Sequence, residues 1–323
     1  MSGICTPDYS RGRKYPLHHA ADSIVIEDKE SQMRKVSVAA IQMRCTDSVE
    51  GNIAQAERMV RQAAEMGANV VLLPELFERP YFCQERRYEY YEYAKSVEEN
   101  DAVVYMKKLA KELHIVLPVS FYERDVNVLY NSVAMIDADG SILGVYRKTH
   151  IPDDHFYQEK FYFTPGNTGF RVWNTAYGCI GVGICWDQWF PETARAMAVK
   201  GAELLLYPTA IGSEPILECD SMPHWQRVMQ GHAACNLMPV VAANRIGIEK
   251  VVPRRENNMQ ESALQFFGSS FITDETGAMQ AEASRDHEEV LVVEFDLDEI
   301  ASNRLNWGLF RDRRPQMYQD IIR

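Results

Sequence analysis

The chain has 323 residues, of which 46% are apolar and 25% are charged, and its formal net charge is −12. This length and composition are typical of a globular protein with one large core. The acidic balance argues against nucleic acid or an anionic membrane as a partner, because binding to phosphate groups requires a basic surface. It favours cationic small molecules instead.

The seven cysteines are an odd number, contain no Cys-x-x-Cys pair and are irregularly spaced. Free thiols are typical of a reducing compartment, so we expect a cytoplasmic location. No apolar run approaches the roughly 18 residues of a membrane span, and the N-terminus lacks a continuous apolar signal segment. Residues 1–32 show little periodicity and mix charges with glycine and proline. We expect a flexible or loosely docked extension there, followed by a single domain over residues 33–323.

Strand and helix patterns alternate along the first half of this domain. A turn signal, Asp137-Ala-Asp-Gly140, separates two apolar runs and predicts an antiparallel hairpin. In chain order, the expected elements are a strand at 36–42, a helix at 49–66, a strand at 70–73, a helix at 102–113, and strands at 115–122, 129–136 and 142–146.

The second half begins with an apolar run, residues 180–184, that predicts a buried strand with Cys185 at its carboxyl end. From Phe190 the apolar spacing becomes helical, and Pro191 suits the first helical position. A thiol at such a strand-to-helix turn can project into a cleft while its backbone stays rigid. The further expected elements are a helix that ends at residue 200, a strand at 204–207, a helix at 226–237, and strands at 240–243, 270–273 and 290–295.

These elements predict an α/β fold whose strands are joined by crossovers, with hairpins added. The few helices could not cover both faces of one sheet that held every strand. Two sheets packed against each other, each with helices on its outer face only, would agree with the number of predicted helices.

Three ionisable residues, Glu75, Lys148 and Cys185, each follow a predicted strand. Open α/β sheets build their sites at the carboxyl ends of strands, so we expect these side chains to meet. A cysteine becomes a nucleophile when a base accepts its proton and a cation lies nearby; a glutamate and a lysine supply these groups. Taken singly, each residue has a structural alternative. Glu75 could cap the next segment, Lys148 could be a solvated surface lysine, and Cys185 could be a buried apolar thiol.

Other site types find no support in the sequence. There is no Gly-x-Ser-x-Gly elbow, and the glycines at 178, 181 and 183 are in the wrong order for a dinucleotide fingerprint. His150 and His155 lack a cysteine or carboxylate partner at zinc-ligand spacing. We therefore expect neither a metal nor a cofactor.

Three strings carry a family resemblance: Leu73-Pro-Glu75, Tyr146-Arg-Lys148-Thr-His150 and Gly183-Ile-Cys185-Trp-Asp. In order and spacing they resemble the signature segments of the nitrilase superfamily of carbon–nitrogen hydrolases, over roughly residue 35 to the C-terminus. The resemblance implies an α/β fold, a four-layer αββα sandwich of the nitrilase type.

Longer strings resemble one branch, the N-carbamoylputrescine amidohydrolases, which act in polyamine biosynthesis. They are Ile151-Pro-Asp-Asp, Tyr157-Gln-Glu-Lys-Phe-Tyr-Phe-Thr-Pro-Gly, Cys185-Trp-Asp-Gln-Trp-Phe-Pro-Glu and Tyr207-Pro-Thr-Ala-Ile-Gly-Ser-Glu-Pro. The branch often has Pro-Gly after the Asp-Asp pair, whereas this chain has His155-Phe156. The loop can therefore close differently, which leaves the length of the substrate open.

The resemblance implies a mechanism. Glu75 would accept the proton of Cys185, the thiolate would attack the ureido carbon, and Lys148 with the backbone N–H of Trp186 would hold the oxyanion. Glu75 would then protonate the leaving amine, and water would hydrolyse the carbamoyl thioester, giving putrescine, carbon dioxide and ammonia. Glu159 matches a second glutamate beside this triad, and we expect it to orient Lys148 or the substrate amide.

The distal end of such a cationic ureido substrate is an ammonium, so the pocket needs a carboxylate. We expect Glu214 to supply it, with Asp187 and Glu218 as alternatives, and Tyr81 and Trp186 could line the four-carbon chain.

Three points stay open. A related ω-amide or β-ureidopropionase-like hydrolase would share the chemistry, although an acidic substrate would require a basic residue in place of Glu214. A catalytically inactive member could serve as a scaffold subunit. Residues 303–315 mix aromatic residues with arginines, a composition that suits an interface. The resemblance implies a homo-oligomer, either a dimer or a larger assembly such as an octamer; the alternative is a tail packed on its own subunit.

Overall fold

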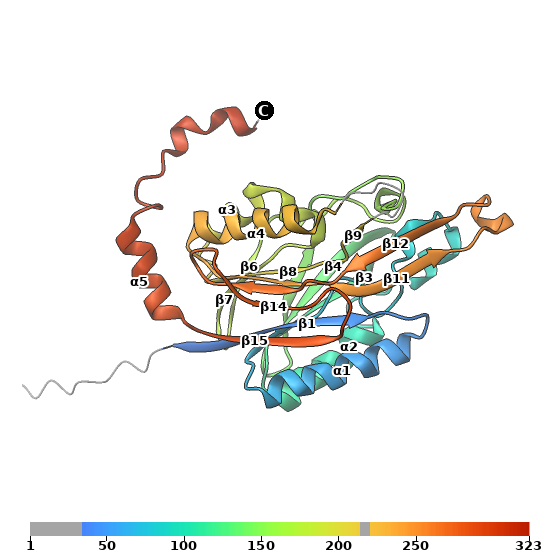
Figure 1. Ribbon diagram of the computed structural model, residues 1–323, viewed down its shortest axis with the longest axis horizontal. Coiled ribbons are helices and arrows are strands. Elements are labelled where there is room, and N and C mark those ends of the chain that lie inside the picture. Colours follow the sequence, from blue (N-terminus) through green and yellow to red (C-terminus); the bar gives the residue numbers. More distant parts are fainter. Residues whose placement is uncertain (1–33, 214–219, 323) are drawn as a thin grey trace, which may run out of the picture. The chain divides into compact units, whose positions relative to one another are not determined.

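A computed structural model describes residues 34–213 and 220–322 (Figure 1). The expected extension, residues 1–32, lies outside this part, so the division into an extension and one domain stays a prediction. The helices are α1 (Val49–Glu65), α2 (Asp101–Leu113), α3 (Pro191–Val199), α4 (Met222–Asn236) and α5 (Leu297–Trp307). The strands are β1 (Lys35–Arg44), β2 (Val70–Leu72), β3 (Leu117–Asp125), β4 (Val128–Ile136), β5 (Ile142–Arg147), β6 (Val172–Thr175), β7 (Gly178–Val182), β8 (Leu204–Pro208), β9 (Gly212–Ser213), β10 (Val240–Ala243), β11 (Arg245–Val251), β12 (Ser262–Phe267), β13 (Phe271–Thr273), β14 (Met279–Glu282) and β15 (Glu289–Asp296).

The strands form two facing groups. In the first, β1 pairs antiparallel with β15 and parallel with β2 and β11, and β12 and β9 continue beyond β11. The antiparallel strands β3, β4 and β5 join this group where the N–H of Val71 donates to the carbonyl of Val116 at 3.0 Å. The second group has the order β14-β13-β10-β8-β7-β6.

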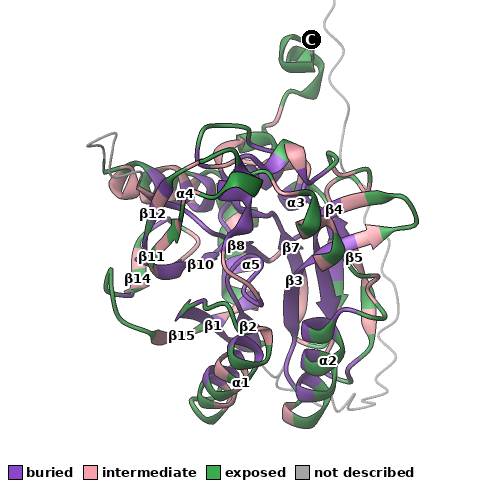
Figure 2. Ribbon diagram, turned by 90° about the vertical axis from the view of Figure 1, so that its right-hand side faces the viewer, coloured by how far each residue is buried: buried purple, intermediate pink, exposed green. Residues whose placement is uncertain are grey.

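Four layers follow from the way side chains alternate along the central strands. In β1, Val38 points into the core between the sheets, whereas Ile41 points into the core beneath α1 and α2. In β8, Leu206 belongs to the core between the sheets and Leu205 to the core beneath α3 and α4. The buried strands therefore lie between two helical layers (Figure 2), and the predicted αββα sandwich is confirmed.

The predicted helices and the hairpin of β4 and β5 are confirmed. Ser48 and Asn100 cap α1 and α2 by accepting backbone N–H groups of the first turn, as expected at helix starts. The strand expected at 180–184 ends earlier, at Val182. The chain forms a 3₁₀ helix over Cys185–Trp189 before α3 begins.

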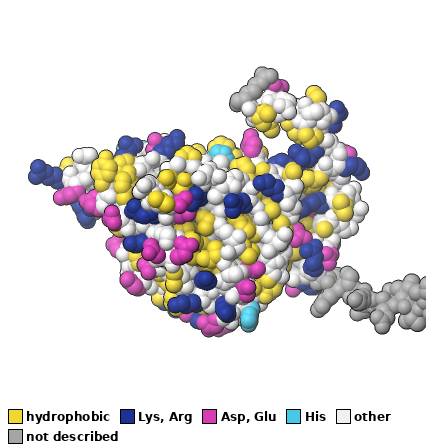
Figure 3. All heavy atoms as spheres, turned by 180° about the vertical axis from the view of Figure 1, so that it is seen from behind, with side chains coloured by type: hydrophobic (Ala, Val, Ile, Leu, Met, Phe, Trp, Pro, Cys, Tyr) yellow, Lys and Arg dark blue, Asp and Glu magenta, His cyan; other side chains and the backbone are white. Residues whose placement is uncertain are grey.

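The helix α5 and the residues after it lie outside the four layers (Figure 1). Large apolar side chains are exposed along this segment, among them Leu305, Trp307, Ile321 and Ile322. Figure 3 shows apolar side chains on it, and shows acidic and basic side chains interspersed on the face in view. Of the helices described, none has both the length and the apolar character to span a bilayer.

Candidate active site

Glu75 follows β2 and its side chain is fully buried. Its Oε1 accepts hydrogen bonds from Nζ of Lys148 at 2.8 Å and from Nδ2 of Asn131 at 2.7 Å. No described group donates to Oε2. This second oxygen can therefore accept a proton, as a general base must.

The backbone beside Glu75 is held by Arg245, a residue that sequence reasoning missed. Leu76 has a φ of +49°, a left-handed conformation that a branched side chain rarely adopts. The buried guanidinium of Arg245 donates to the carbonyl of Glu75 at 2.7 Å and to that of Leu76 at 3.1 Å. Arg245 thus positions the carboxylate through its own backbone. It lies two residues after a predicted strand, so the rule that indicated Glu75 could have found it.

Lys148 lies between two carboxylates. Its Nζ donates to Oε1 of Glu75 at 2.8 Å and to Oε2 of Glu159 at 2.7 Å, and all three side chains are fully buried. Burial alone would lower the pKa of Lys148, but the charges of Glu159 and Glu75 outweigh it and raise this pKa well above the usual value. The lysine is therefore an ammonium. The expected contact of Glu159 with Lys148 is present.

Burial raises the pKa of Glu159 above its usual value, and the Lys148 ammonium acts in the opposite direction. The hydroxyl of Tyr81 donates to Oε1 of Glu159 at 2.6 Å. Tyr81 is buried and is not among the described lining residues of the cavity, so a contact with the substrate chain stays a prediction.

Cys185 begins the 3₁₀ helix after β7 and has a φ of +42°, the second left-handed non-glycine residue beside this cluster. Such strain is typical of functional sites that the surrounding structure holds in place. Burial raises the pKa of the Cys185 thiol above its usual value, the charge of Glu75 raises it further, and the Lys148 ammonium lowers it. The sulfur is therefore a thiol until a base takes its proton.

Asp187 does not contact the pocket, contrary to its assignment as a substrate-binding alternative. Its Oδ2 accepts from the hydroxyl of Tyr146 at 2.8 Å and from the N–H of Ile184 at 2.9 Å. Its Oδ1 accepts from the N–H of His150 at 3.0 Å and lies 2.7 Å from Nδ1 of that residue. Both oxygens are thus occupied. They join the segment after β5, which carries the ammonium, to the turn that carries the thiol.

A cavity of about 350 Å³ opens beside the thiol. Trp186 lines it and is 39% exposed, so its predicted contact with the substrate chain stays a prediction. Glu214 lies outside the described residues, so its role stays a prediction. No lysine, arginine or histidine is among the described lining residues, which are Pro152, Asp153, Asp154, Tyr157, Glu159, Cys185, Trp186, Trp189, Ala210, Ile211, Gly212 and Ser221.

Among residues 34–213 and 220–322, no group of three or more His, Cys, Asp and Glu side chains is arranged to hold a metal ion. The chemistry available to the site is that of its own side chains: the thiol of Cys185 lines the cavity, and the charges of the buried Glu75 and Lys148 act on it.

Residues 37–304 match the carbon-nitrogen hydrolase family. The chain belongs to this family. An N-carbamoylputrescine amidase of Oryza sativa subsp. japonica is 57% identical over 289 residues, 89% of this chain and 95% of that protein. A citrullinase of Francisella tularensis is 53% identical over 292 residues, 90% of this chain and 99% of that protein.

The crystal structure of a carbon-nitrogen hydrolase from Helicobacter pylori G27 has the same fold, with a TM-score of 0.82 and 36% identity over 90% of this chain and 99% of that one. The predicted membership of the nitrilase superfamily and the predicted class of enzyme, a cysteine-dependent amidohydrolase, are confirmed.

Replacing Asp187 with asparagine tests its assignment as a positioning residue. In the wild-type chain, hydrogen-bond donors contact both oxygens of the Asp187 carboxylate. The asparagine amide keeps one acceptor oxygen, but its NH₂ group would face some of these donors. Hydrogen bonds to a charged group contribute about 1.5–3 kcal/mol each. We expect Asp187→Asn to lower the free energy of unfolding by about 2–3 kcal/mol, measured by urea denaturation. Asp153→Asn, the same chemical change at the pocket rim, should leave the urea midpoint unchanged. Equal midpoints for the two variants would contradict the assignment.

Proposed function

We propose that the protein hydrolyses N-carbamoylputrescine to putrescine, carbon dioxide and ammonia. The observation that carries the proposal is a thiol, Cys185, that lines a cavity whose described charged lining is entirely acidic and that feels the charges of the buried Glu75 and Lys148. Such a cavity suits a ureido group with a cationic tail. Relatives named N-carbamoylputrescine amidase, at 53–57% identity over about 90% of the chain, support the choice of substrate.

The first half of the reaction transfers the carbamoyl group to sulfur. Glu75 accepts the proton of Cys185 and the thiolate attacks the ureido carbon. Lys148 and the backbone N–H of Trp186 stabilise the oxyanion; that N–H lies in the first turn of a 3₁₀ helix, where backbone donors have no partner within the helix. The carbon–nitrogen bond to putrescine breaks as Glu75 returns the proton to the departing amine.

The second half releases the carbamoyl group. Glu75, again a carboxylate, accepts a proton from water, and the hydroxide adds to the thioester carbon. The carbon–sulfur bond breaks and Cys185 recovers its proton. The carbamic acid so formed decomposes to carbon dioxide and ammonia. Glu159 holds the Lys148 ammonium in place throughout, so that both oxyanions meet a fixed charge.

The distal ammonium of the substrate requires a carboxylate at the other end of the cavity. Asp153 and Asp154, which belong to the string Ile151-Pro-Asp-Asp, line it. Glu214 remains a candidate, because Gly212 and Ser221, on either side of the undescribed residues 214–219, both line the cavity. We assign recognition of the ammonium to this acidic rim as a whole.

A ureido compound that also carries a carboxylate is the second candidate substrate, because one relative is named citrullinase. L-citrulline differs from N-carbamoylputrescine by a carboxylate on the carbon that bears the amine. That carboxylate would lie against an acidic rim with no basic partner in the described lining, as would the carboxylate of N-carbamoyl-β-alanine. A carboxylate beside this rim meets like charges, which disfavours both compounds.

We also infer that the protein is a homo-oligomer, either a dimer or a larger assembly such as an octamer. The exposed apolar residues of α5 and the tail support association, since such surfaces are typical of interfaces. We infer a cytoplasmic location from the thiols, because all five cysteines in the described part are free.

A panel of ureido compounds tests the substrate. We expect kcat/KM for N-carbamoylputrescine to exceed that for L-citrulline and for N-carbamoyl-β-alanine by about 10²-fold or more, which corresponds to roughly 3 kcal/mol of like-charge repulsion. Ammonia release measures each rate. Equal values for the three compounds would exclude a cation-selective pocket, and no turnover of any of them would favour the inactive scaffold.

Asp153→Asn tests the acidic rim. Removal of one rim charge should raise KM for N-carbamoylputrescine about tenfold, because about 1.4 kcal/mol of attraction is lost, and should leave kcat nearly unchanged. N-butylurea, which lacks the ammonium, should show no change. Asp286→Asn is the matched control, since Asp286 is exposed and does not line the cavity. An equal rise in KM for N-butylurea would show that the variant disturbs the ureido end instead.

A further inference from the structure

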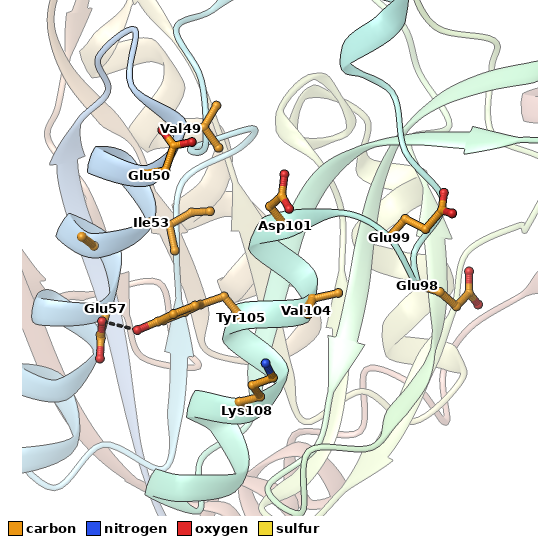
Figure 4. Close-up of a pocket in the computed structure, with 11 residues that line it drawn as sticks. Val49, Glu50, Ile53, Glu57, Glu98, Glu99, Asp101, Val104, Tyr105 and Lys108 are labelled. Atoms are coloured by element: carbon orange, nitrogen blue, oxygen red, sulfur yellow. Dashed lines mark hydrogen bonds between the residues drawn. The ribbon is translucent and has the colours of Figure 1, made fainter.

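A second cavity, of about 640 Å³, lies between α1 and α2 and shares no lining residue with the cavity beside the thiol (Figure 4). None of its lining residues carries a buried polar atom that lacks a hydrogen-bond partner in the described part of the chain. Two such atoms lie instead in the active-site cluster. They are Oε2 of Glu75, which is the base of the proposed mechanism, and Oδ1 of Asn131, a residue that the mechanism does not use.

Asn131 contacts both members of the central ion pair. It lies in β4, the middle strand of the sheet β3-β4-β5, and is fully buried. Its Nδ2 donates to Oε1 of Glu75 at 2.7 Å, and its backbone carbonyl accepts the N–H of Lys148 at 2.8 Å. Asn131 is not among the described lining residues of the cavity beside the thiol. It therefore holds the base and the residue that carries the ammonium from behind, away from the substrate.

Two donors at Oε1 fix the plane of the Glu75 carboxyl group. The last torsion of a glutamate side chain is broad and roughly two-fold, so a carboxylate held at one point can exchange its two oxygens. The ammonium of Lys148 has three rotatable donors and can follow either oxygen. The amide of Asn131 is planar and starts from a paired strand, so it donates from one fixed direction. This donor holds Oε1 and thereby leaves Oε2 for the proton.

The asparagine is not explained by stability alone. Its Oδ1 is buried and accepts from no described group, and a buried acceptor without a donor is unfavourable. A leucine at this position would avoid that cost, but it could not donate to Glu75. The feature that accounts for an asparagine here is its N–H donor.

We propose that Asn131 is a positioning residue for the general base. Its amide fixes the carboxyl group of Glu75 so that Oε2 receives the proton of Cys185 and passes it to the leaving amine. In the second half-reaction, Oε2 receives a proton from water and returns it to the sulfur, while Oε1 keeps both of its donors. This inference rests on the proposed role of Glu75, but it does not depend on which ureido compound is the substrate.

Removal of the amide tests this role. We expect Asn131→Ala to lower kcat for N-carbamoylputrescine about 10²-fold, because a positioned base contributes about 10²–10⁴-fold. KM should stay within about twofold, because Asn131 does not line the cavity. Alkylation of Cys185 by iodoacetamide should slow by a similar factor, since it also requires removal of the thiol proton. This second measurement uses no ureido compound, so it tests Asn131 even if N-carbamoylputrescine is not turned over.

Ser132→Ala is the matched control. Ser132 is the next residue of β4, so its side chain points to the opposite face of the sheet. There its buried hydroxyl donates to Oε2 of Glu123 at 2.5 Å. The variant thus also loses one donor to a carboxylate in the same strand, but outside the active site. It should keep the kcat and the alkylation rate of the wild type.

Asn131→Asp separates positioning from a purely structural role. When protonated, the aspartate introduced at position 131 can donate its O–H to Oε1 of Glu75 in place of the amide. When ionised, it has no donor and repels that carboxylate. The ratio of its kcat to the wild-type kcat should therefore fall as the pH rises. The variant retains the ionisable groups whose charges act on Glu75, which include Lys148, Glu159, Cys185, Arg245, Tyr81 and Cys83.

Three results would overturn the proposal. They are a wild-type kcat and alkylation rate in Asn131→Ala, an equal loss of both in Ser132→Ala, and a ratio for Asn131→Asp that does not change with pH. Near-ultraviolet circular dichroism shows whether each variant is folded. If Asn131→Ala does not fold, the pH dependence of Asn131→Asp, whose side chain has the same shape as the wild-type one, decides.

Discussion

The site depends on one buried ammonium. Lys148 lies within 2.8 Å of the carboxyl groups of Glu75 and Glu159, and all three side chains are fully buried. Its ammonium lowers the pKa of Glu159 against the raising effect of burial. Breaking a buried ion pair costs about 3–5 kcal/mol, because the remaining charge is left without compensation. In the proposed mechanism, the same ammonium leaves one oxygen of Glu75 free to act as a base and supplies a fixed positive charge for an oxyanion. Structure and chemistry thus rest on the same contact.

The rest of the fold holds this cluster from two sides. Arg245, at the start of β11, binds the backbone carbonyls on either side of the strained turn after Glu75. Asp187 joins the segment after Lys148 to the turn that carries Cys185. Both residues are buried and hydrogen-bonded, and neither touches the cavity. The substrate therefore meets groups whose geometry is set before it binds, which lowers the cost of reaching the transition state.

The sequence predicts the parts of this arrangement that follow strand ends. Glu75, Lys148 and Cys185 were found because each comes directly after a regular apolar run. The roles of Asp187 and Tyr81 could not be predicted, because position in the chain does not tell which way a side chain points in a 3₁₀ helix or a loop. The strand β11 was missed because Glu249 and Lys250 interrupt its apolar pattern.

The central claim is that thiol, carboxylate and ammonium converge on one ureido carbon. Intact-protein mass spectrometry after rapid acid quench of turnover with N-carbamoylputrescine tests it most directly. We expect a wild-type fraction heavier by one carbamoyl group, with the added mass on the peptide that contains Cys185, and neither adduct nor ammonia release in Cys185→Ala. Ammonia release that persists in Cys185→Ala, or an adduct on another residue, would contradict the account.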